Sequence, residues 1–197
     1  ADDLIAAGLV QVNGKVIVTM GYKVQPSDEV KYNGSLIKSE KKKYLVLNKP
    51  KGFITSITDK KAKKTVEELV GNACRERLYP VGSMDRTSTG VLLFTNDVDL
   101  AKKMAHPKNG AVQIISVVLD KPLLKTHLTA IAKGMELEDG KIDVEEIKYI
   151  DERTKREVGL RLHSGKHRVV NRIFDKFGYT IEKMDRVSYA GFTKKNL

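Results

Sequence analysis

The feature that most constrains the fold of this chain is a short polar turn between two apolar segments. Residues 79–82 approach the turn, and the apolar run 91–94 leaves it. Runs of branched apolar side chains bounded by glycine and proline are typical of strands buried in a sheet. One carboxylate, Asp85, lies in the turn. Functional groups are commonly held on a loop that a rigid sheet positions, so Asp85 is the first candidate for a functional residue.

Length and composition indicate a folded protein without a membrane segment. The chain has 197 residues, 41% of them hydrophobic and 31% charged, which is enough for one medium domain or a small module beside a larger one. No run of about 18 apolar residues is present, so no membrane partner is expected. The single cysteine, Cys74, cannot form an internal disulfide and predicts a reducing, cytoplasmic compartment.

The charge balance favours a polyanionic partner. The formal net charge is +11, and a basic surface of this size attracts phosphate backbones. The alternative is that the lysines form an ordinary solvated face, which is the better interpretation of any one lysine taken alone. The sequence contains neither a glycine-rich phosphate loop with its lysine nor a cysteine–histidine cluster, so no metal and no small-molecule cofactor is expected.

Residues 1–40 are predicted to form a small helix-plus-hairpin module. Residues 2–7 have the pattern of a helix end, and Gly8 follows as its left-handed cap. Asn-Gly pairs at 13–14 and 33–34 predict two tight hairpin turns. Because the sequence opens with alanine inside a predicted helix, we expect this module to be partial and to lack its start. The charged stretch 39–43 is the predicted linker.

Residues 41–197 are predicted to form an α+β domain whose mixed sheet is mostly antiparallel. Predicted strands outnumber predicted helices, and hairpin turns recur along the segment. The strands are expected at 44–47, 78–81, 91–95, 113–119, 142–150, 158–162, 179–181 and 187–192. The helices are expected at 65–74, 97–104, 125–133 and 168–177, with a capping box at the start of the first. No unexplained apolar stripe remains, so a monomer is expected.

Several segments, in a fixed order, resemble the RNA pseudouridine synthases that modify ribosomal RNA, in the RsuA/RluB branch. The segments are the opening strand and turn at 47–52, the motif 79–97 around Asp85, the helix and His-Pro stop at 100–107, the hairpin at 136–140 and the stretch 163–170. Residues 1–37 resemble part of the ribosomal-protein-four-type RNA-binding module that precedes this domain in the branch. The resemblance therefore covers almost the whole chain.

The resemblance implies the isomerisation of a specific uridine to pseudouridine in ribosomal RNA, without a cofactor. It implies that Asp85 acts as nucleophile or as base, and the sequence does not choose between these two routes. Without the surrounding motif, Asp85 would be an aspartate capping its own polar turn. Lys166 and Arg168 are the candidates for a cation that pairs with Asp85.

Five basic residues are expected to contact RNA. Two of them, Lys49 and Lys51, belong to the turn that opens the larger domain, and Arg86 follows the candidate carboxylate. The other two are Arg172, in the last predicted helix, and Lys15, in the N-terminal module. Cations of this kind bind the phosphate backbone with a strong dependence on salt.

Four positions depart from the family pattern. Ser83 stands where the family has an arginine that fills the place of the flipped base, and a serine cannot fill that gap. Gln113 and Ile115 stand where the family has a lysine and a tyrosine, and Ile115 supplies neither a π-face nor a hydroxyl. Asn171 replaces a second basic residue. Two hypotheses therefore stay open, an active isomerase and an RNA-binding homologue whose chemistry is weakened or lost.

Overall fold

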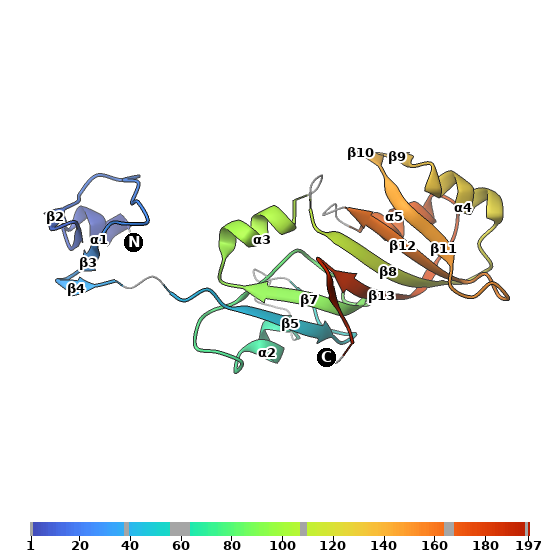
Figure 1. Cartoon of the computed structure of the whole chain (residues 1–197), viewed down its shortest axis with the longest axis horizontal. Helices are drawn as coiled ribbons and strands as arrows, with labels where there is room; N and C mark the ends of the chain where they lie inside the picture. The colour runs from blue at the N-terminus through green and yellow to red at the C-terminus, as the bar shows by residue number, and fades with distance from the viewer. Residues whose placement is uncertain (1, 38–39, 56–63, 107–109, 164–167, 196) are drawn as a thin grey trace. The chain divides into compact units, whose positions relative to one another are not determined.

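The computed structural model describes residues 2–37, 40–55, 64–106, 110–163, 168–195 and 197 (Figure 1). The chain divides into two compact units, Ala1–Lys41 and Lys42–Leu197. The boundary between them falls within the charged stretch 39–43. Each unit has a sheet of its own, and the candidate carboxylate Asp85 lies in the second unit.

In the first unit, the described residues form one short helix and a four-stranded antiparallel sheet. Its elements are α1 (Asp2–Ala6), β1 (Val10–Val12), β2 (Lys15–Val16), β3 (Val30–Tyr32) and β4 (Ser35–Leu36), with the strand order β2-β1-β3-β4. Both predicted Asn-Gly turns are confirmed. Asn13 and Asn33 have φ of 51° and 47°, and the glycine after each is also left-handed. Positive φ at both central residues is what a two-residue hairpin turn requires.

The second unit is built on an eight-stranded mixed sheet. The strands run in the order β11-β12-β8-β13-β7-β5, with β14 paired to β13 and β6 paired to β7. Of these strand pairs, β13 and β7 are parallel and the others antiparallel. The strands are β5 (Tyr44–Lys49), β6 (Tyr79–Pro80), β7 (Thr89–Thr95), β8 (Val112–Leu119), β11 (Val144–Tyr149), β12 (Glu157–His163), β13 (Ile181–Tyr189) and β14 (Phe192–Thr193). The predicted α+β class with a mostly antiparallel sheet is confirmed.

Among the residues that the structure describes, four helices and one small hairpin complete the second unit. The helices are α2 (Val66–Val70), α3 (Val98–Met104), α4 (Lys125–Ala132) and α5 (Val169–Asp175), and the hairpin pairs β9 (Met135–Leu137) with β10 (Gly140–Ile142). Figure 1 shows α2 and α3 at β7 and β5, and α4 and α5 at the other half of the sheet. The main core lies in that other half, where α5 buries Val169, Val170, Ile173 and Phe174 against the sheet.

Strand β7 is buried on both faces, which explains why its sequence is continuously apolar. Leu92 and Phe94 pack with α2, whereas Val91 and Leu93 pack in a separate cluster that includes residues of α3. Side chains alternate between the two faces of a strand, so both faces need apolar residues when helices cover both. The polar turn that carries Asp85 is therefore attached to one of the most deeply buried strands of the unit.

Two predicted elements are corrected by the structure. The helix expected to reach Cys74 ends at Val70, because Gly71 follows, and Cys74 lies beyond it with its thiol donating to the Glu76 carbonyl. The two strands expected at 179–181 and 187–192 form one strand, β13, followed by the two-residue β14. No strand was expected over 182–186, where four of the five residues are charged. Pairing with β8 and β7 keeps the strand continuous there.

The parallel contact between β7 and β13 depends on Gly90. Its φ is 110°, and in register it pairs with Arg186. A Cβ at this position would overlap the Arg186 carbonyl oxygen and lie 2.7 Å from the Arg186 nitrogen. Only glycine allows the two backbones to approach this closely.

We expect Gly90→Ala to lower the free energy of unfolding by about 2–6 kcal/mol, the sum of backbone strain and steric overlap. Urea unfolding followed by circular dichroism measures this change. Gly159→Ala is the matched control, because a Cβ there would meet only the Ile150 side chain at 3.4 Å. The control should change stability by less than about 1 kcal/mol. Equal losses in the two variants would contradict the close approach at Gly90.

Candidate active site

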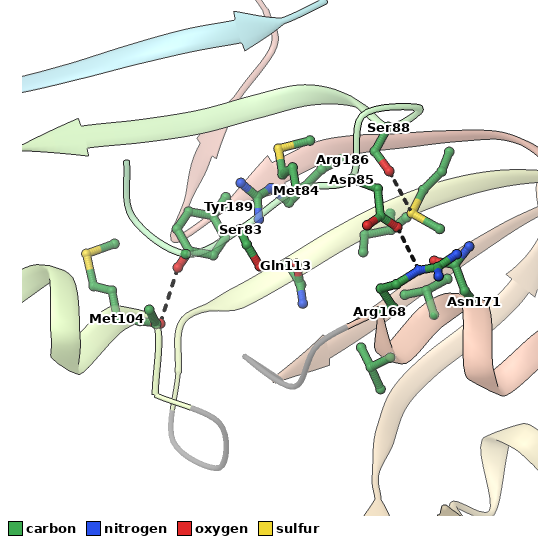
Figure 2. Close-up of a pocket in the computed structure, with 16 residues that line it drawn as sticks. Ser83, Met84, Asp85, Ser88, Met104, Gln113, Arg168, Asn171, Arg186 and Tyr189 are labelled. Atoms are coloured by element: carbon green, nitrogen blue, oxygen red, sulfur yellow. Dashed lines mark hydrogen bonds and ion pairs between the residues drawn. The ribbon is translucent and has the colours of Figure 1, made fainter. Parts of the chain in front are cut away.

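A cavity of about 100 Å³ lies beside Asp85. Its walls come from parts of the sequence that are far apart, namely the loop 82–88, strand β8, the start of α5 and strand β13 (Figure 2). The loop is the polar turn that the sequence singled out. The sheet order, in which β13 lies between β8 and β7, brings these segments together.

Asp85 forms an ion pair with Arg168 at the start of α5. The distance from Arg168 Nε to Asp85 Oδ2 is 3.3 Å, and the side chains are 52% and 28% exposed, respectively. Arg168 has φ of 48°, in the left-handed region. Such a conformation is costly for a residue other than glycine, and strained residues of this kind tend to cluster at functional sites. The structure thus pairs Asp85 with one of its two predicted cations, while the other, Lys166, lies outside the described residues.

Lys49 is fully buried beneath the loop that carries Asp85. Its ammonium donates to the Ser88 carbonyl at 2.8 Å, the Asp85 carbonyl at 3.1 Å and the Pro50 carbonyl at 3.3 Å. Burial lowers the pKa of Lys49 to about 8, against an opposing attraction from Asp85. The prediction that Lys49 contacts RNA is therefore wrong for this structure, because the ammonium faces the inside of the protein. Lys49 instead fixes the backbone of the loop at two points.

The residues on either side of Asp85 are held by the segment that follows Lys49. Met84 exchanges two hydrogen bonds with the Thr55 hydroxyl, at 3.1 and 3.3 Å. The Gly52 N–H donates to the Arg86 carbonyl at 2.8 Å, and Arg86 Nε donates back to the Gly52 carbonyl at 3.1 Å. The carboxylate is therefore carried by a backbone fixed before, at and after its own position, which preorganises the group.

All four positions at which the sequence is expected to depart from the family pattern line the cavity. Ser83 is in the loop, Gln113 and Ile115 are on β8, and Asn171 is on α5. Figure 2 shows Ser83 and Gln113 close to one another and Asn171 close to Arg168. The departures seen in the sequence are therefore concentrated at one place in the structure, next to Asp85.

Among the cavity residues that sequence reasoning missed are a cation and an aromatic ring on β13, Arg186 and Tyr189. Arg186 is 6% exposed, its Nε donates to the Val91 carbonyl at 2.7 Å, and its guanidinium carbon lies 4.3 Å from the centre of the Tyr189 ring. Burial lowers the pKa of Arg186 to about 10. The segment 182–186, in which four of the five residues are charged, lay between two expected strands, and no signal in it indicated a buried arginine.

In register, Arg186 pairs with Ile115 and Tyr189 pairs with Gln113. A β-bulge between Arg186 and Ser188 interrupts the regular alternation of β13. The bulge explains how residues three apart, rather than two apart, can line the same cavity. Strand β13 thus places a cation and an aromatic ring directly beside the two substituted positions of β8.

The other predicted RNA contacts remain predictions. Lys51, Arg86 and Lys15 are exposed, with Lys15 on the first unit. Arg172 is half-buried and paired with Asp139 at 2.9 Å. Within the described residues, no group of three histidine, cysteine or acidic side chains could hold a metal ion. No helix in the same residues is long and apolar enough to cross a membrane.

We expect Lys49→Met to change how stability depends on pH. The pKa of Lys49 is about 8 in the folded protein against 10.5 for a free side chain, so between these values the unfolded chain binds more protons at this site. The free energy of unfolding of the natural chain then rises with pH, by up to about 1.4 kcal/mol per pH unit from this group alone. The Lys49→Met variant lacks this rise.

Urea unfolding of both proteins at a series of pH values between neutral and 10.5 measures the difference. Lys51→Met, which removes an exposed lysine from the same turn, is the control and should follow the natural chain. A constant difference between the Lys49→Met variant and the natural chain across this range would contradict the buried ammonium.

Comparisons with known proteins agree with this geometry. The sequence pattern of the family described as RNA pseudouridylate synthase matches residues 43–176. The chain is 34% identical to ribosomal large subunit pseudouridine synthase B of Bacillus subtilis (strain 168), over 100% of this chain and 82% of that protein. It is 31% identical to an uncharacterized RNA pseudouridine synthase of Aquifex aeolicus (strain VF5), over 95% of this chain and 76% of that protein.

A solved structure supports the fold independently of sequence. The crystal structure of a pseudouridylate synthase superposes with a TM-score of 0.68 at 23% identity, covering 98% of this chain and 82% of that one. Together, the matched residues and the identity to relatives establish what the motif around Asp85 suggested. The chain belongs to the RNA pseudouridine synthases of the RsuA/RluB family, which are isomerases.

Proposed function

We propose that this chain converts a specific uridine of ribosomal RNA to pseudouridine and that Asp85 is its catalytic carboxylate. The observation that carries the proposal is the placement of Asp85 in the cavity. It is partly exposed, paired with Arg168 and held on a loop that Lys49 anchors. The ribosomal substrate is supported by the Bacillus subtilis relative, whose name refers to the large ribosomal subunit.

The reaction is an isomerisation, so no atom is gained or lost overall. The bond between N1 of the base and C1′ of the ribose breaks, the base turns while it is held, and C5 bonds to C1′. C5 then loses its proton and N1 gains one. Asp85 can serve as a nucleophile that bonds transiently to carbon or as a base that removes a proton, and both roles need a positioned carboxylate.

The size of the cavity is consistent with a single base taken out of the RNA stack. Enzymes that act on a base extrude the nucleotide into an active-site pocket, and Asp85 lines a partly open pocket rather than a flat surface. Arg168 is the more exposed member of the ion pair. It can therefore orient Asp85 and still face the RNA that remains outside the cavity.

One observation favours the second candidate, an RNA-binding homologue with weakened chemistry. Each of the four departures from the family pattern lies in the wall of the cavity rather than elsewhere on the surface. Ser83 occupies the loop position where the family is expected to have an arginine. Ile115 offers a small apolar contact where the family is expected to have an aromatic ring. The two candidates share RNA binding and differ in product formation, which an activity measurement separates.

We expect Asp85→Asn to reduce pseudouridine formation by at least about 10³-fold, because the amide can neither attack carbon nor accept the proton. The assay measures pseudouridine by mass spectrometry after incubation with unmodified ribosomal RNA. Binding of the same RNA should persist. Asp143→Asn is the matched control, since Asp143 is exposed, lies outside the cavity and forms an ion pair with Lys141. Full activity in the Asp85→Asn variant would contradict the catalytic role.

We expect Ser83→Arg combined with Ile115→Tyr to increase the rate of pseudouridine formation. The arginine can occupy the place that the base vacates, and the tyrosine ring can stack on the base that enters. Ile115 is 5% exposed, so the larger ring costs about 1–3 kcal/mol of stability, and thermal unfolding must be measured in parallel.

Ser83→Lys combined with Ile115→Phe is the comparison, because it supplies charge and a ring without the guanidinium plane or the hydroxyl. If the folded Arg/Tyr variant is no faster than the natural chain, loss of chemistry through these two positions is ruled out.

A further inference from the structure

Arg186 is a buried cation in the cavity wall that the proposed reaction leaves without a role. A guanidinium has five N–H donors on three nitrogen atoms. Of these atoms, only Nε has a hydrogen-bond acceptor among the described residues, the Val91 carbonyl at 2.7 Å. Nη2 is buried and has no partner among those same residues. A buried charged donor without an acceptor is costly, so the arrangement points to an acceptor that arrives with a ligand.

The position of the guanidinium narrows what that ligand can be. Arg186 lines the same cavity as Asp85, and Figure 2 shows it beside Tyr189 and Ser83. Its carbon lies 4.3 Å from the centre of the Tyr189 ring, so the ring covers one face of the guanidinium. The N–H donors at the edge of the guanidinium can therefore donate to an oxygen of a group bound in the cavity.

RNA offers acceptors on its phosphates, on its ribose and on the edges of its bases, and the phosphates and the ribose belong to the backbone. Arg186 is only 6% exposed, whereas the backbone phosphates of a bound RNA stay near the surface, where the half-exposed Arg168 lies. A base that leaves the stack is the part of the RNA that enters a pocket. Desolvating a neutral carbonyl also costs far less than desolvating a phosphate. The depth of Arg186 therefore favours the base.

We propose that Arg186 recognises the base, by donating a hydrogen bond from a terminal guanidinium nitrogen to a carbonyl oxygen of the pyrimidine in the cavity. This inference rests on the proposed function, because it takes the target of Asp85 to be a uridine. Uracil has carbonyl oxygens at positions 2 and 4. When the N1–C1′ bond breaks, its electron pair stays with the base, and a fixed cation stabilises the negative charge that spreads to these oxygens.

The test measures binding of uridine 5′-monophosphate by NMR titration, together with analogues of this nucleotide that lack either the 2-oxygen or the 4-oxygen. We expect the natural chain to bind one of the two analogues about 10- to 100-fold more weakly, since a hydrogen bond to a charged group is lost. Arg186→Lys should bind uridine 5′-monophosphate more weakly by a similar factor. It should also no longer distinguish that analogue from uridine 5′-monophosphate.

Arg156→Lys is the matched control. Arg156 Nε also donates to a strand carbonyl, that of Leu119 at 2.8 Å, but Arg156 is paired with Glu182 and does not line the cavity. This variant should bind all three nucleotides as the natural chain does. Equal affinity of the natural chain for the three nucleotides would overturn the proposal. So would unchanged binding by a folded Arg186→Lys variant.

The comparison of nucleotides on the natural chain needs no variant, so equal affinities would overturn the proposal even if Arg186→Lys fails to fold. Repeating the titrations in Asp85→Asn separates this inference from the proposed function. Carbonyl-dependent binding without any pseudouridine product from the natural chain would leave the role of Arg186 standing and overturn the isomerase. Pseudouridine formation together with equal binding of the three nucleotides would support the isomerase and overturn the role of Arg186.

Discussion

The site depends on the hydrogen bonds that the buried ammonium of Lys49 donates to backbone carbonyls of the loop around Asp85. This ammonium joins the end of β5 to the carbonyls of Asp85 and Ser88, so the loop cannot move without breaking charge-assisted hydrogen bonds. Burying a lysine is costly, and the lowered pKa of Lys49 reflects that cost. Three carbonyl acceptors offset it. Burial of Lys49 fixes the position of the Asp85 carboxylate, because hydrogen bonds hold the backbone that carries this side chain.

The contact between β7 and β13 has a similar role for the rest of the cavity. Gly90 allows these strands to pair in parallel at Arg186, which joins the half of the sheet next to α2 and α3 to the half that carries α5. The loop with Asp85 precedes β7, and Arg168 begins α5. The ion pair between them therefore depends on a sheet in which sequence-distant strands are neighbours, and one glycine makes that order sterically possible.

Local signals in the sequence predicted much of the fold, and tertiary burial explains what they missed. Neighbouring residues determine the Asn-Gly turns, the apolar strand after Asp85 and the apolar stripe of α5. These elements could therefore be predicted from the sequence. Asp85 and the four altered positions came from the family motif. Lys49 and Arg186 looked like surface charges because a lysine in a turn or an arginine in a charged segment is usually solvated. Their burial arises only when distant strands pack over them.

The register between β8 and β13 bears on the choice between an active isomerase and an RNA-binding homologue with weakened or lost chemistry. Considered on β8 alone, Gln113 and Ile115 leave the cavity without the cation and the ring of the family pattern. Their partners across the strand pair are Tyr189 and Arg186, and both line the same cavity. The wall thus contains an aromatic ring and a cation, next to the two positions where the family pattern is expected to have them. With the Asp85–Arg168 pair also in place, the groups needed to hold a base beside a carboxylate are present, which favours the isomerase.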